Sequence, residues 1–279
     1  MLYYGRQWYY HLSSQANISK TSGLADLFDT NTFIPELQTW AAQSARPADV
    51  TSAVNYLVLA IGSQAEDEKT ATTYFLRGKN LALSALAGNL SVGTVQSFIL
   101  TTLYMLRSCQ INAGYMFFGI AARSAYAIGL HRTEVNSRFG PEIHTRRDNL
   151  WKSVRVLDLY LSISMGRPPA AADPDCTVAY TTPAPVHAPN QPHQANQANG
   201  YSNGGGSSVG SREKFDLLNA SAQILSLVER IIWRVYSRRK ISSKLTEDIS
   251  RELRAWSRQW LAGCAVARCF SYYCTGRWW

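Results

Sequence analysis

The stretch GYMFFGIAARSAYAIGLHR, from Gly114 to Arg132, has the clearest periodic pattern in the chain. Large apolar residues recur in it at helical spacing, and small residues stand between them. The pattern predicts an amphipathic helix over 113–128 that neighbouring helices can approach closely. Gly129 follows where helices commonly end in the left-handed conformation. The small residues are Ala113, Gly114, Gly119, Ala121, Ala122 and Ala125.

The same period recurs on both sides of this segment, and no stretch alternates like a strand. Ser91 is expected to cap one helix, and the prolines of Gly166-Arg167-Pro168-Pro169 should end another. We therefore predict an all-α fold, an irregular multi-helix bundle or array with a long disordered insert. The further helices are expected over 50–61, 70–86, 91–106, 145–164, 215–235 and 241–260.

Composition suggests how this chain of 279 residues is divided. We expect a helical domain over 1–185, with its core signature in 74–185. A Pro-, Gln/Asn- and Gly-rich stretch over 186–211 should form the flexible insert, because it has almost nothing to bury. Two further helices of the same domain follow in 212–261. The tail 262–279 looks atypical, like a truncation or an artefact of the gene model.

The net charge of +9 is unevenly distributed along the chain. From Arg212 onward there are 13 basic and 6 acidic residues, a net +7, whereas the preceding residues hold 15 and 13, a net +2. This basic third can indicate contact with nucleic acid or an acidic partner, or simply a solvated helix face. No apolar run approaches the roughly 20 residues of a membrane span, so no membrane partner is expected.

No group of residues indicates a catalytic or metal site. Cys264, Cys269 and Cys274 are five residues apart without a C-x-x-C pair, whereas structural zinc sites have closer ligands and need four. Cys109 is expected to be a buried packing residue, and His131 to bond the carbonyls of a helix end. The odd number of cysteines favours the cytosol or nucleus.

Two sequence blocks carry a family resemblance. The first is A-x-R-x-A followed by Gly129-Leu130-His131-Arg132. The second, RRDNLWKSVRVLDLYLSISMGRP, includes Trp151, Asp158 and Gly166-Arg167-Pro168, and is followed by the acidic residues Asp173 and Asp175. Together they resemble the regulatory (middle homology) domain of the fungal binuclear zinc cluster transcription factors. The likeness continues over 238–260.

The resemblance implies a nuclear domain that regulates transcription and is not an enzyme. Family members bind DNA through an N-terminal six-cysteine module that holds two zinc ions, and here no cysteine precedes Cys109. The chain is therefore expected to be a fragment without its DNA-binding module. It should contain no catalytic, metal or DNA-binding residue and no cofactor. DNA would be reached only through the missing upstream module, and a coactivator or a small-molecule effector is a candidate partner.

The signature residues are interpreted as structural. Trp151 should lie in the core, and Asp158 in the fifth helix should pair with Arg132 or Arg167, which follow helix ends. Two other classes of protein remain as alternatives: a helical protein-interaction scaffold without a transcriptional role, and an all-α enzyme with a dispersed site. The enzyme would require an acidic motif such as D-D-x-x-D, which the sequence lacks.

Overall fold

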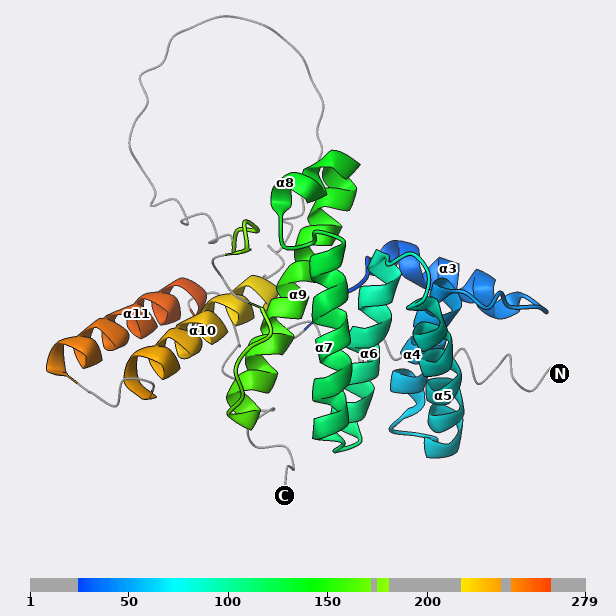
Figure 1. Ribbon diagram of the computed structural model, residues 1–279, viewed down its shortest axis with the longest axis horizontal. Helices are drawn as coiled ribbons and strands as arrows, with labels where there is room; N and C mark the ends of the chain where they lie inside the picture. Colours follow the sequence, from blue (N-terminus) through cyan, green and yellow to red (C-terminus); the bar gives the residue numbers. More distant parts are fainter. Residues whose placement is uncertain (1–24, 172–174, 181–216, 237–241, 262–279) are drawn as a thin grey trace, which may run out of the picture.

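The computed structural model describes residues 25–171, 175–180, 217–236 and 242–261, and within these ranges every regular element is helical (Figure 1). The predicted all-α class is therefore confirmed. The expected flexible insert over 186–211 and the tail over 262–279 lie outside the described residues, as do Asp173 and the three C-terminal cysteines.

Every helix expected from the periodicity is present, with bounds that differ by a few residues. The elements are α3 (Thr30–Ala42), α4 (Val50–Ser63), α5 (Glu68–Ala85), α6 (Val92–Arg107), α7 (Ile111–Ala127), α8 (Thr133–Asn136), the 3₁₀ turn η1 (Ser137–Phe139), α9 (Pro141–Met165), α10 (Leu217–Ile231), the π-helical turn η3 (Ile232–Tyr236) and α11 (Ser243–Leu261). Three of these were not expected: α3, α8 and η1.

Side-chain caps explain why several helices begin where they do. Asp49 and Asp67 accept hydrogen bonds from backbone N–H groups in the first turns of α4 and α5. Ser91 caps α6 as predicted and forms a reciprocal capping box with Thr94. Each cap satisfies donors that have no partner inside the helix.

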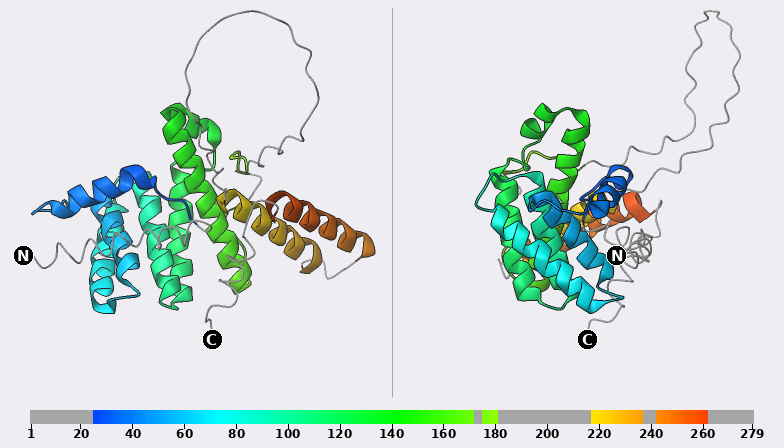
Figure 2. Two further views of the ribbon diagram at one scale, coloured as in Figure 1. Left: turned by 180° about the vertical axis from the view of Figure 1, so that it is seen from behind. Right: turned by 90° about the vertical axis from the view of Figure 1, so that its right-hand side faces the viewer.

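The helices form an irregular array that is organised around α9 (Figure 1). On one side, α7 and α6 pack against α9, and α4 and α5 follow outward. On the other side, α10 packs against α9 and α11 packs against α10. Figure 1 and the left view of Figure 2 show the α10–α11 pair projecting away from the rest of the array. Helices from both sides of the predicted insert therefore pack against each other, since α10 follows the insert and α9 precedes it.

Small residues allow close helix contacts. A Cβ atom added to Gly78 in α5 would lie 2.8 Å from Cγ of Leu57 in α4. In α7, Ala121, Ala122 and Ala125 are buried, as expected for closely packed helices. The main core contains the aromatic and aliphatic side chains of α4, α6, α7 and α9, whereas α10 joins α9 through a second, much smaller apolar cluster.

The structure corrects the expected position of Cys109. Its side chain is exposed, and the residue has a φ of 57° in the turn after α6. The prediction of a buried packing residue is therefore wrong, because α6 ends at Arg107 and Cys109 lies in the turn after it. Gly129 and Gly166, in contrast, adopt φ values of 71° and 63° and end their helices, as the sequence predicts for Gly129.

Candidate functional site around helix α9

The first signature block meets the second at Trp151. This side chain is 0% exposed, as predicted for a core residue. The Tyr126 ring lies edge-on to it at 5.3 Å between centroids, and the His131 ring lies at 5.8 Å. The indole Nε1 donates to Sγ of Cys176 over 2.9 Å. Leu130, beside this cluster in sequence, is also fully buried.

His131 packs on aromatic rings, which differs from its predicted role as a helix cap. Its ring lies 4.8 Å from that of Tyr126, and its buried Nδ1 makes no hydrogen bond with the described residues. Burial lowers the pKa of His131, and the nearby Arg132 lowers it further, while Asp175 acts in the opposite direction. The neutral ring is therefore favoured in the folded chain.

A buried charged network connects α9 to the Gly-Arg-Pro loop and to α10. Arg155, which is 1% exposed, donates to the carbonyl of Ala171 over 2.7 Å and to Glu229 of α10 over 2.6 Å. Its guanidinium also lies 3.5 Å from the carboxylate of Asp158. Glu229 follows Arg155 by 74 residues and lies on the other side of the predicted insert. The ion pair between them therefore holds α10 against α9.

Asp158 holds the loop after α9, and this corrects its predicted pairing with Arg132 or Arg167. Its two carboxylate oxygens accept the backbone N–H groups of Ala170 and Ala171 over 2.9 and 2.8 Å. Burial raises the pKa of Asp158, while these two N–H donors and Arg155 oppose the increase. The partners satisfy a carboxylate that would otherwise be costly to bury.

The other signature residues lie where the helices end. Arg167 follows α9, donates to Asn112 of α7 over 2.8 Å and stacks 4.5 Å above the ring of Tyr115. Arg132 is exposed and precedes α8, and Pro168 is exposed in the loop that Asp158 holds. The structure thus gathers both blocks around α9.

A second polar cluster, which the sequence did not indicate, joins α8 to α9. Thr133 donates to Asp148 over 2.9 Å and lies 2.7 Å from Nε2 of His144. Asn136 donates to Asp148 over 2.7 Å and accepts from Nε of Arg147 over 2.8 Å. The four-residue α8 has no periodicity of its own, so only the i, i+4 pair His144–Asp148 could have suggested this cluster.

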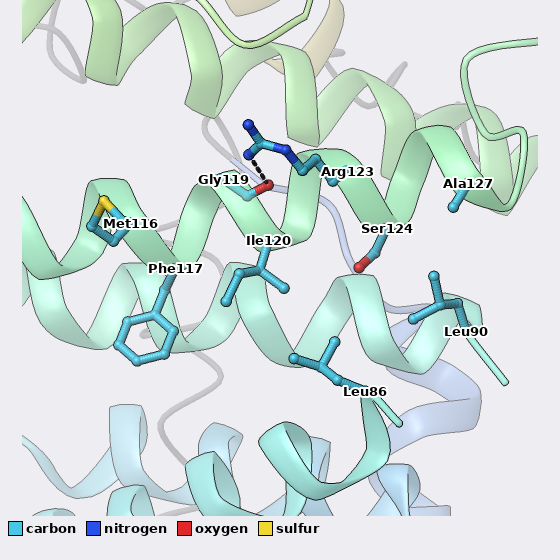
Figure 3. Close-up of a pocket in the computed structure, with 9 residues that line it drawn as sticks. All are labelled: Leu86, Leu90, Met116, Phe117, Gly119, Ile120, Arg123, Ser124 and Ala127. Atoms are coloured by element: carbon cyan, nitrogen blue, oxygen red, sulfur yellow. Dashed lines mark hydrogen bonds between the residues drawn. The ribbon is translucent and has the colours of Figure 1, made fainter. Parts of the chain in front are cut away.

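An apolar hollow of about 540 Å³ runs along α7, and we call it the α7 groove (Figure 3). Leu86 and Leu90 form one wall from the link between α5 and α6, while the other wall is α7 itself. The Met116 side chain is 69% exposed at one end. Arg123 donates to the carbonyl of Gly119 over 3.2 Å across the rim. The α7 residues are Met116, Phe117, Gly119, Ile120, Arg123, Ser124 and Ala127.

Within the described ranges there is neither a membrane-spanning helix nor a metal-binding cluster. None of their helices has the length and apolar character needed to cross a membrane. No group of three or more His, Cys, Asp or Glu side chains among them could hold a metal ion.

Comparisons with known proteins agree with the signature. The model of the fungal specific transcription factor domain matches residues 18–258. An uncharacterised transcriptional regulatory protein of Schizosaccharomyces pombe is 37% identical over 91 residues, which are 33% of this chain and 12% of that protein. The transcription regulator galc of Aspergillus niger is 27% identical over 146 residues, covering 48% and 18% of the two chains.

An acetamidase regulatory protein of Aspergillus fumigatus is 41% identical over 71 residues, 25% of this chain and 9% of that protein. The matched segments thus span less than a fifth of each of these three relatives. No solved structure matches the chain. The family match covers most of the sequence and includes both signature blocks. The chain therefore belongs to the fungal specific transcription factor domain family and is a regulatory domain of a fungal transcription factor.

Proposed function

We propose that this regulatory domain works in the nucleus as part of a longer transcription factor and catalyses no reaction. It reaches specific DNA sites through a zinc-cluster module that residues 1–279 do not contain. The regulators that it resembles are much longer than the matched segments, which supports a role as one part of a larger protein.

The observation that carries the proposal is that the signature residues contact other parts of the same domain. Trp151 and Leu130 are buried in the core, Asp158 binds the loop after α9, and Arg167 joins that loop to α7. Their side chains make contacts within the domain. This supports the interpretation that the signature is a structural frame for a regulatory domain.

The α7 groove is the place where we expect a small-molecule effector to bind this domain. Its volume of about 540 Å³ falls in the range of roughly 300–1,000 Å³ that is typical of small-molecule sites. Apolar side chains form most of its lining, which favours a small apolar effector at this place. Met116→Asp, at a groove residue whose side chain is 69% exposed, should abolish effector-dependent transcription and leave melting unchanged, and Leu253→Asp on α11, where the side chain is 37% exposed, provides the control.

The proposal about DNA is tested by competition. The purified chain is mixed with a labelled CGG-containing duplex and an equal amount of scrambled duplex at about 0.15 M salt. We expect no preference, because specific readout needs side chains placed against base edges in a groove. A reproducible preference of about tenfold, equivalent to about 1.4 kcal/mol, would show that the chain reads DNA by itself.

A further inference from the structure

Helix α11 has one face that packs on α10. The indole Nε1 of Trp256 donates to the carbonyl of Ala220 over 3.3 Å, and that of Trp260 donates to Gln223 over 2.8 Å. Glu252, on the same side of α11, pairs with Arg230 over 2.9 Å. With about 3.6 residues per turn, these contacts define which α11 residues point away from α10.

The opposite side of α11 is basic. Four cationic side chains stand there at spacings of three, four and seven residues, and all four are exposed. Two carboxylates lie beside them, the exposed Glu247 and the half-buried Asp248. We call this surface the α11 basic face. Its cations are Lys244, Arg251, Arg254 and Arg258.

Carboxylates of the domain neutralise this face only in part. Arg251 pairs with Asp248 over 2.7 Å. Arg254 and Arg258 donate through Nε to backbone carbonyls of α11 over 3.1 and 3.3 Å, and neither forms an ion pair within the described residues. Other arginines of the described residues do pair with carboxylates: Arg155, for example, is buried between two of them.

We infer that the α11 basic face binds the phosphate backbone of DNA without reading its sequence. From Lys244 to Arg258 the helix rises about 21 Å, at about 1.5 Å per residue. One DNA strand presents about six phosphates over that length, at one per about 3.4 Å. Arginine guanidinium groups suit this partner because they bond phosphate oxygens in pairs.

An acidic protein segment fits this surface less well. Protein interfaces depend on a few apolar or aromatic anchors in desolvated pockets. The α11 basic face has no large apolar side chain, since Trp256 and Trp260 are turned toward α10. Figure 1 shows α11 at the end of the array, beyond α10.

This contact goes beyond the proposed function. A regulatory domain held on specific DNA by another module would gain sequence-independent affinity from α11. Loss of the contact would lower affinity for all duplexes equally, whereas failure of the proposed function would appear as sequence preference in the competition assay.

The test measures binding of the full chain to a fluorescent scrambled duplex while salt is raised from about 50 to 200 mM. The variant Arg251→Gln/Arg254→Gln/Arg258→Gln removes three cations but retains good helix formers. We expect the slope of log affinity against log salt to become shallower by about 2.7, at about 0.9 per phosphate contact. Glu247→Gln should tighten binding.

A matched control removes three exposed cations elsewhere, with Lys69→Gln/Arg77→Gln/Arg138→Gln, and should leave the slope unchanged. Circular dichroism verifies that each variant is folded. If the triple variant is unfolded, Arg254→Gln alone replaces it, and the slope of log affinity against log salt is then expected to change by about 0.9. Equal changes in both triple variants, or no DNA binding by the wild type, would overturn the inference. Tighter binding to poly-glutamate than to DNA at equal salt would also overturn it and indicate an acidic protein partner.

Discussion

Replacing Trp151 by alanine tests the structural interpretation of the signature most sharply. The indole is fully buried, contacts Tyr126 edge-on and donates to Cys176. Truncation removes the transfer free energy of the side chain and leaves a cavity, a combined loss of about 3–5 kcal/mol for a buried tryptophan. For a domain of this size each kcal/mol lowers the melting temperature by about 2–4 °C, so a decrease of about 6–20 °C is expected.

Trp233 provides a control of the same residue type, because its side chain is 60% exposed. Trp233→Ala should change the free energy of unfolding by less than about 0.5 kcal/mol. Both variants are compared with the wild type by urea denaturation followed by circular dichroism, and by thermal melting. Equal stabilities of Trp151→Ala and the wild type would refute the reasoning, since the side chain would then be available for a binding role.

Three further substitutions follow from the same frame. Asp158→Ala leaves the N–H groups of Ala170 and Ala171 without acceptors, so urea denaturation should show a loss of at least about 1–3 kcal/mol. Gly129→Ala should lower the free energy of unfolding more than Gly166→Ala. Both glycines have a positive φ, but only at Gly129 would the new Cβ lie close to a neighbour, 3.1 Å from Val135. Thermal melting ranks the two variants. A smaller loss at Gly129 would contradict this. The pKa of His131 is lowered on folding, so its neutral ring contributes stability that is present above the ordinary pKa of 6.5 and is lost as pH falls through the pKa of the folded state. His131→Phe should therefore weaken the decrease in the free energy of unfolding on acidification. An identical pH profile of the variant and the wild type would argue against it.

The sequence predicted the helices better than it predicted their contacts. Apolar periodicity located every long helix except α3, where Phe33, Leu37 and Trp40 are buried at helical spacing. Pro35 lies inside that helix and obscured the pattern, because proline normally ends helices. Similarly, α9 begins at Pro141, four residues before the predicted start, since proline suits the first position of a helix.

The candidate site was predictable only in part. The burial of Trp151 follows from its place on an apolar helix face. The partners of Asp158 do not, because the N–H groups of Ala170 and Ala171 are backbone donors that no residue type reveals. The pairing of Arg155 with Glu229 depends on how α10 returns to α9 after the predicted insert, and local sequence does not contain that information.

The central claim is that this chain regulates transcription while another module selects the DNA, and a tethering experiment tests it directly. The chain is fused to an unrelated DNA-binding domain in a fungal host, and transcription of a reporter carrying that domain's site is measured. We predict that the fusion changes reporter transcription relative to the DNA-binding domain alone, that Trp233→Ala retains the change, and that Trp151→Ala loses it. Equal transcription from the DNA-binding domain alone and from a folded, nuclear fusion would contradict the claim.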